Sequence, residues 1–178
     1  KNKRAMLAGI AVLCLFIAAG CVHQWQMLNR QLFVLYNSGK EIRIELINGK
    51  NAMVLYSPDS ISPQLQQYVL QPAHINWHIN SVEQRVRKHN LVRIGGKTIF
   101  ILNQPVLDTT IKADYVVLNY NAKGMDVHTF KKVFNPVKLV IGNNISKNKA
   151  EAMIQEAERI GLSVHDVHMD GAFVLQGN

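Results

Sequence analysis

The chain has 178 residues, of which 48% are apolar, and its formal net charge is +8, from twenty Lys and Arg against twelve Asp and Glu. Such a composition is normal for a globular domain, and the chain after the first thirty residues is long enough for one domain with a proper core. Both cysteines, Cys14 and Cys21, lie in an apolar N-terminal stretch. This excludes a disulfide framework and a cysteine-based zinc site from the rest of the chain.

The apolar stretch covers residues 5–22 and follows three basic residues. About 20 mainly apolar residues let a helix cross the hydrocarbon core of a bilayer, and Trp25 suits the far interface. A soluble core helix is a poor interpretation, because the stretch has no polar stripe. A cleaved signal that ends at the lipobox-like residues 18–21 is the alternative. Basic residues stay on the cytoplasmic side, so both interpretations place residues from about 28 onward outside the cytoplasm.

Short strands are predicted directly after the apolar stretch. They cover residues 31–37, 41–46 and 52–56, with turn residues at 37–40 and a tight turn at Asn48-Gly49. Joined in this way, the three strands predict a meander with one face buried.

The next segment is predicted to hold two short helices and a hairpin. Ser62 and Pro63 are typical of a helix start, and this helix is expected to end at Pro72. Ser81 is expected to start a second short helix through Val86. Residues 91–94 and 97–102 form apolar runs on either side of a glycine pair, which predicts a tight hairpin.

From Asp114 onward, buried strands alternate with helices. Continuous apolar runs at residues 115–118 and 137–141 are typical of strands covered on both faces. Asp126 and Ser146 are the expected N-caps of two amphipathic helices. Residues 163–167 and 172–175 are predicted as strands, with Asp170-Gly171 as the turn between them. A strand-rich first half and a β-α second half predict an α/β domain with helices packed outside its sheets.

Seven histidines raise the question of a metal site. His74 and His78 are four residues apart but lack the Glu of a His-Glu-x-x-His motif, and a surface or interface pair is the favoured interpretation. His165 and His168 lie beside two aspartates, and a metal site there is also the less favoured interpretation. The sequence has no Gly-rich phosphate loop and no Gly-x-Ser-x-Gly elbow. We therefore expect no metal, no other cofactor and no catalytic residue.

Three runs of the second half resemble parts of one known domain. These are residues 113–118, 134–142 and 162–175. In this order they resemble the end of the metallo-β-lactamase-like domain at the C-terminus of ComEC-type competence proteins, the inner-membrane channels for DNA uptake. The first strand with its turns resembles the opening of that domain, and the middle matches poorly. The resemblance implies a truncated metallo-β-lactamase-like sandwich of mixed β-sheets with outer helices, preceded by one transmembrane helix.

The departures from the family's pattern fall on its metal-binding motifs. Residues 119–122 are Asn-Tyr-Asn-Ala where catalytic members carry His-His-Gly-Ser, and residues 35–40 replace an Asp-Val-Gly-Gln-Gly-Asp turn. The main His/Asp cluster, due between Tyr56 and Leu91, is missing. Two-metal hydrolysis needs several such ligands. The resemblance therefore implies a degenerate domain that is not an enzyme, as in the ComEC-like proteins of Bacteroidetes-type bacteria.

We accordingly expect residues 1–29 to be the last helix of a membrane channel domain in a bacterial inner membrane. Residues 30–178 are expected to form the degenerate domain on the periplasmic side. The expected partners are the membrane, other helices of the same channel protein and single-stranded DNA. The candidate DNA-binding residues, which would contact phosphate without reading sequence, are Arg85, Arg87, Lys88, Lys131 and Lys132. The alternatives are ordinary solubilising charge and an exported, membrane-anchored or lipidated α/β binding domain unrelated to DNA.

Overall fold

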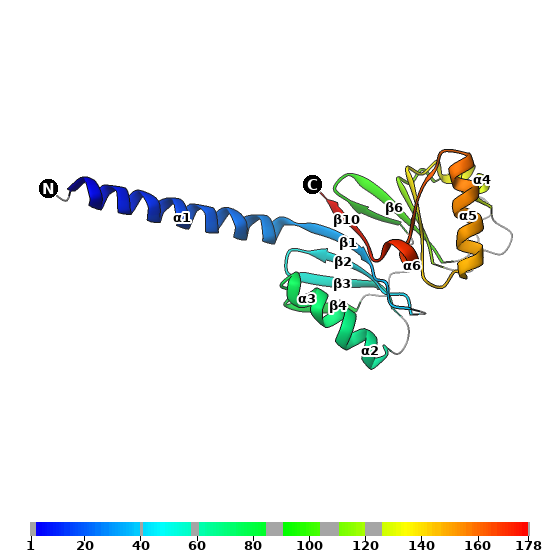
Figure 1. Cartoon of the computed structure of the whole chain (residues 1–178), viewed down its shortest axis with the longest axis horizontal. Coiled ribbons are helices and arrows are strands. Elements are labelled where there is room, and N and C mark those ends of the chain that lie inside the picture. The colour runs from blue at the N-terminus through cyan, green and yellow to red at the C-terminus, as the bar shows by residue number, and fades with distance from the viewer. Residues whose placement is uncertain are drawn as a thin grey trace.

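The N-terminal helix projects away from a folded domain (Figure 1). The computed structural model describes residues 3–39, 41–57, 61–84, 91–103, 111–119 and 126–177. Helix α1 spans Lys3–Asn29, and within it Met6–Asn29 is long and apolar enough to cross a membrane, judged by length and composition. The most apolar window of this segment has a mean hydropathy of 2.3 and is not buried against the rest of the molecule. The predicted N-terminal apolar helix is therefore present.

In the described parts of the chain, ten strands form two five-stranded sheets. The first sheet has the order β10-β1-β2-β3-β4 and consists of β1 (Gln31–Leu35), β2 (Ile44–Asn48), β3 (Asn51–Tyr56), β4 (Ser81–Gln84) and β10 (Phe173–Gly177). The second sheet follows chain order and consists of β5 (Leu91–Ile94), β6 (Lys97–Leu102), β7 (Tyr115–Leu118), β8 (Lys138–Ile141) and β9 (Ser163–Asp166). Both are mixed, because β3 and β4 are parallel in the first sheet, and β6 to β9 are parallel in the second.

The two sheets pack face to face, and helices cover both outer faces. The outer helices of the first sheet are α2 (Pro63–Leu65), the π-helical η1 (Gln66–Leu70) and α3 (Gln71–Asn76). Those of the second sheet are α4 (Val127–Phe134) and α5 (Lys147–Arg159). Separate apolar clusters fill the space between the sheets and the space under each helix layer. This confirms the predicted α/β sandwich of mixed sheets with outer helices.

Strand β1 shows why its sequence is apolar at nearly every position. Phe33 and Leu35 point into the space between the sheets, whereas Leu32 and Val34 point toward the outer helices. All four are buried. The expected meander with only one buried face is therefore wrong, because α2, η1 and α3 cover its second face.

Two predictions for the middle of the chain are also wrong. The helix that begins after Ser62 continues past Pro72 to Asn76, because the π-helical turn puts Pro72 in the first turn of α3. A missing N–H is tolerated at that position. The segment Ser81–Gln84 is strand β4 and not a helix, because it pairs in parallel with the otherwise open edge of β3. The rest of that predicted helix lies outside the described residues.

The last two strands do not form a hairpin as predicted. Strand β9 pairs with β8 in the second sheet, whereas β10 pairs with β1 in the first. The short helix α6 (Val167–Asp170) carries the chain across, and Gly171 turns it with a φ of 84°. The two sheets are thus joined at the end of the chain.

Candidate functional site

The four parallel strands of the second sheet end at one edge of that sheet. Ligands of open α/β sheets bind in the crevice outside such carboxyl ends. After β6, β7, β8 and β9, the chain continues into Asn103, Asn119, Gly142-Asn143-Asn144 and Val167-His168, respectively. We refer to this region as the carboxyl edge.

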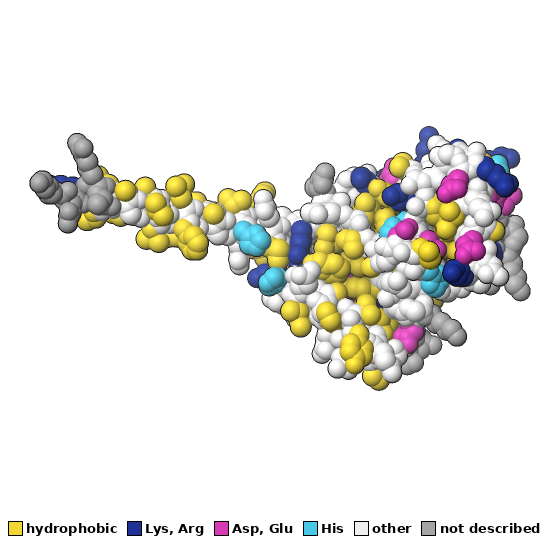
Figure 2. All heavy atoms as spheres, in the orientation of Figure 1, with side chains coloured by type: hydrophobic (Ala, Val, Ile, Leu, Met, Phe, Trp, Pro, Cys, Tyr) yellow, Lys and Arg dark blue, Asp and Glu magenta, His cyan; other side chains and the backbone are white. Residues whose placement is uncertain are grey.

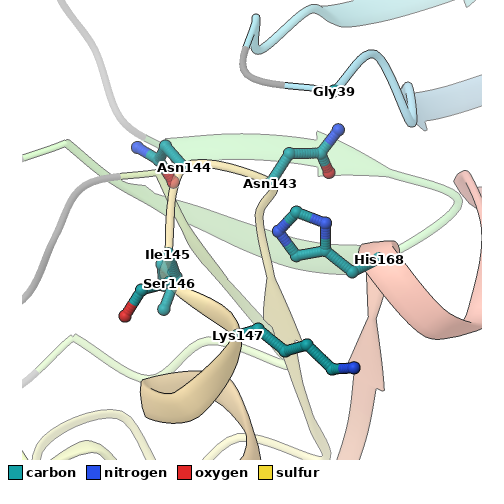
Figure 3. Close-up of a pocket in the computed structure, with 7 residues that line it drawn as sticks. All are labelled: Gly39, Asn143, Asn144, Ile145, Ser146, Lys147 and His168. Carbon is teal, nitrogen blue, oxygen red and sulfur yellow. The ribbon is translucent and has the colours of Figure 1, made fainter.

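A pocket of about 560 Å³ opens at the carboxyl edge (Figure 3). Its lining residues are Gly39, Asn143, Asn144, Ile145, Ser146, Lys147 and His168. In Figure 3, the His168 ring points toward Asn143, whereas Ser146 points to the other side of its loop. Ser146 is the N-cap residue of α5, as predicted, but its side chain makes no capping hydrogen bond.

Asparagine side chains join the loops around this pocket. Asn143 Nδ2 donates to Asn37 Oδ1 (3.3 Å), which connects the loop after β8 with the loop after β1. Asn144 Nδ2 donates to Asn119 O (2.7 Å), and Asn119 Nδ2 donates to Asn103 Oδ1 (2.6 Å). The amide oxygens of Asn119 and Asn143 are buried and have no partner within the described ranges. Because an unsatisfied buried acceptor costs about 1–3 kcal/mol, both oxygens suit a water molecule or a ligand with a hydrogen-bond donor.

The histidines considered as metal ligands belong to no metal-binding group in the described part of the chain. Over the residues that the structure describes, no group of three or more His, Cys, Asp or Glu is placed to hold a metal ion. His74 Nε2 lies 2.9 Å from Glu45 Oε2 under α3, and His165 Nε2 lies 3.1 Å from Gly171 O. His168 lines the carboxyl-edge pocket, whose lining has no carboxylate among the described residues. Of the segment 119–122, only Asn119 is described, and it is buried at this edge.

The opposite edge of the second sheet, where the parallel strands begin, is basic. We define this basic edge by Arg93, Lys97, Lys112, Lys131, Lys132, Lys138 and Arg159. Helices α4 and α5 both end here because each returns the chain to the start of the next parallel strand. In Figure 2, dark-blue side chains lie at the top of the domain, over the second sheet and its helices.

Contacts at the basic edge bring several of these cations together. Lys131 Nζ donates to Ile160 O, which joins the ends of α4 and α5. Arg93 and Lys112 line one hollow of about 390 Å³ with Asn135, the C-cap residue of α4. Asp114 lies in the same hollow, but its Oδ2 accepts from Thr98 N (2.7 Å), so the carboxylate is already bound to the backbone. Among the described residues, no ion pair joins any of the seven cations of this edge to a carboxylate.

Two of the five predicted DNA-binding residues, Lys131 and Lys132, lie exposed on α4 at the basic edge. Arg85, Arg87 and Lys88 lie outside the described residues. Sequence reasoning missed Lys112 and Arg159 as members of the same surface. Lys112 lies just before the start of a parallel strand, and Arg159 is in the last turn of a connecting helix. The direction of each β-α unit would have predicted that these residues lie at the same edge of the sheet.

A buried polar cluster connects β2 with α3 on the far side of the first sheet. Glu45 is fully buried, and its carboxylate accepts from Tyr36 Oη (2.8 Å) and from Arg43 Nε (2.8 Å), with His74 Nε2 at 2.9 Å. Burial alone would raise the pKa of Glu45, but the hydrogen bonds from His74, Tyr36 and Arg43 hold this pKa below its ordinary value. Burial, followed by the charge of Glu45, raises the pKa of Tyr36. His74 comes from α3 and Glu45 from β2, so their contact holds α3 on the sheet.

The lowered pKa of Glu45 predicts that acid destabilises the domain. An unfolded Glu binds a proton near pH 4.3, whereas folded Glu45 binds it only at lower pH. The stabilisation from this carboxylate is therefore complete well above about pH 4.3 and is lost as the pH falls through the folded pKa. We expect urea unfolding of the full chain in detergent to show this loss, and Glu45→Gln to show a weaker pH dependence. Equal pH dependence in both proteins would contradict the assignment.

Comparison with known families connects this fold to a group of proteins. The ComEC C-terminal domain model matches residues 33–177, which include both sheets, both helix layers and both edges described above. No curated protein and no solved structure matches the chain. The match starts in β1 and ends in β10, two strands that pair with one another. The chain therefore belongs to the family of ComEC C-terminal domains, which connects it with competence and the uptake of DNA.

Proposed function

We propose that this chain is the end of an inner-membrane channel for transforming DNA, with residues 1–29 as the channel's last helix. The family match and the candidate membrane span support this proposal. Basic residues precede the span, so the positive-inside rule places the domain of residues 30–178 in the periplasm. The match argues against an exported binding domain unrelated to DNA.

The domain contacts single-stranded DNA through its basic edge. The observation that carries this proposal is the gathering of seven Lys and Arg residues where the parallel strands begin and the outer helices end. Cations on such a surface bind phosphates without regard to sequence, as the transport of arbitrary DNA requires. Lys97 Nζ also lies 5.7 Å from the centroid of the Tyr115 ring, so the edge has an aromatic side chain beside its cations.

The domain does not cleave the DNA. Two-metal hydrolysis needs several His and Asp ligands around the ions. The helix–sheet–sheet–helix order supports a degenerate metallo-β-lactamase-like fold. In such a fold, the pocket at the carboxyl edge takes the place of a catalytic centre. Its described lining offers His168, Lys147 and asparagine amides, which form a polar pocket and not a metal centre.

We expect the double variant Lys131→Gln/Lys132→Gln to bind single-stranded DNA more weakly than the parent chain. Each lost phosphate contact reduces the slope of log affinity against log salt by about 0.7, so two contacts reduce it by about 1.4. Fluorescence anisotropy of a labelled oligonucleotide, titrated with the full chain in detergent over a range of salt, measures both quantities.

The matched control for this experiment is Lys147→Gln/Lys149→Gln. It removes the same charge from α5, but at the carboxyl edge. We expect its affinity and salt slope to stay close to those of the parent chain. Equal losses in both double variants would show that net charge and not the basic edge attracts DNA. If the parent chain has no affinity for single-stranded DNA, or an affinity that does not change with salt, the domain does not bind DNA phosphates and acts as a scaffold.

A further inference from the structure

The membrane helix and the domain are joined through a single residue, Arg30. Arg30 Nε donates to Gly49 O (3.3 Å), Arg30 Nη2 donates to Trp77 O, and Gly49 N donates to Arg30 O (2.9 Å). Gly49 also lies against the last turn of α1, since a Cβ there would be 2.6 Å from Leu28 O. The end of α1 is therefore fixed to the β2–β3 turn and to the end of α3.

The length of α1 places this junction at the surface of the bilayer. The 24 residues of Met6–Asn29 make a helix of about 36 Å at about 1.5 Å per residue. The hydrocarbon core is about 30 Å thick, and each headgroup layer adds about 5–7 Å. When α1 spans the membrane, Arg30 and the parts of the domain bonded to it lie in the headgroup layer.

A crevice of about 350 Å³ opens at the junction, between the last turns of α1 and the first sheet. Its lining has two kinds of side chain. Those with N–H donors are His23, Gln26, Arg30 and Gln176, and the mainly apolar ones are Met27, Leu32, Val174 and Trp77, whose indole also carries an N–H. No acidic side chain lines it within the described ranges. Donors beside an apolar wall suit a phosphate that is attached to glycerol and acyl chains.

The guanidinium of Arg30 lacks an anionic partner in the described part of the chain. Its hydrogen bonds go to the carbonyl oxygens of Gly49 and Trp77, and Nη1 lies 3.4 Å from Met27 Sδ. Burial lowers the pKa of Arg30, because water is removed and no carboxylate replaces it. A lipid phosphate in the crevice would supply the missing negative charge.

The end of α3 also suits the bilayer surface. Ile75 is 75% exposed, although it is only two residues from Trp77, whose carbonyl accepts from Arg30. Figure 1 shows α3 on the side of the domain from which α1 leaves. Trp is enriched at membrane interfaces, and an exposed Ile is stabilised when it enters the headgroup boundary.

We propose that the crevice between α1 and the first sheet binds an anionic phospholipid, with its phosphate on Arg30 and its glycerol region against Met27, Val174 and Trp77. This site rests on the proposed membrane placement of α1 but not on DNA binding. It holds the domain close to the membrane in one orientation.

The two tryptophans of the chain allow a direct test, because each reports one part of the proposal. Trp25→Phe leaves only Trp77, and the full chain is reconstituted in vesicles that contain lipids brominated near the headgroup. We expect brominated phosphatidylglycerol to quench Trp77 more strongly than equally brominated phosphatidylcholine. Arg30→Gln in this background should reduce that preference about fivefold, as expected for one basic residue at an anionic surface.

Three further variants keep the test specific. Arg30→Lys retains the charge and should retain the preference for phosphatidylglycerol, whereas Lys132→Gln removes a charge from the distant α4 and should not alter it. Trp77→Phe leaves Trp25, whose quenching reports the insertion of α1 independently. Quenched Trp25 with unquenched Trp77, or equal quenching of Trp77 by both lipids, would overturn the lipid site. Binding of single-stranded DNA in the same vesicles reports the proposed function separately.

Discussion

Replacement of Glu45 by Ala is expected to lower the free energy of unfolding by about 3–5 kcal/mol, the range seen when one partner of a buried ion pair is removed. The variant leaves the Arg43 guanidinium, which is 3% exposed, without the carboxylate that lies 2.7 Å from its Nη2. Tyr36 and His74 lose the same acceptor. Urea unfolding of the full chain in detergent, followed by circular dichroism, measures the change.

Two variants test the cause of this loss. Glu151→Ala removes a carboxylate that is 57% exposed on α5, and surface changes of this kind alter stability by only about 0.5 kcal/mol. The double variant Arg43→Met/Glu45→Leu removes both charges and should recover part of the stability, because no buried charge is left unpaired, while Tyr36 and His74 still lack their acceptor. A double variant as unstable as Glu45→Ala would show that packing and not charge explains the effect.

The second large effect is expected at Phe130 in α4. Phe130 is fully buried between α4 and the second sheet, so Phe130→Ala should lower the free energy of unfolding by about 3–5 kcal/mol. The same helix presents Lys131 and Lys132, and a loosened α4 should therefore also weaken the binding of single-stranded DNA. Unfolding and anisotropy titrations on one preparation measure both results.

Val137 provides the matched control for this prediction. It follows α4 in the chain but is 66% exposed, and Val137→Ala should change stability by only about 0.5 kcal/mol. Normal DNA affinity in a destabilised Phe130→Ala chain, measured where the domain remains folded, would contradict the role of α4 in DNA binding.

Local signals in the sequence predicted much of the second half of the fold. Asp126 caps α4 as expected, with Oδ1 accepting from Thr129 N (2.7 Å), and the glycine pair joins β5 to β6. Continuous apolar runs marked β7 and β8 because each has an apolar cluster on both faces. These features depend on residues that are close together in the chain.

The errors arose where distant segments decide the structure. The segment Ser81–Gln84 is a strand because it pairs with the edge of β3. Strand β10 pairs with β1 in the first sheet and not with β9 in the second. The candidate site shows the same limit. Lys131 and Lys132 could be named from the sequence, but grouping them with Arg93 and Lys112 required the order and direction of the strands. The asparagines of the carboxyl edge come from three separate loops, and no local pattern marked them.

The pairing of β1 with β10 affects how the chain is made. Strand β1 directly follows α1 and ends at Leu35, whereas β10 begins at Phe173, so β1 is synthesised long before its partner β10. Until β10 arrives, one side of β1 has unpaired backbone groups, which are prone to pair with other chains. The first sheet can therefore be completed only after synthesis reaches Gly177, while α1 is already available for membrane insertion. A chaperone that shields this open edge would protect the nascent domain from aggregation.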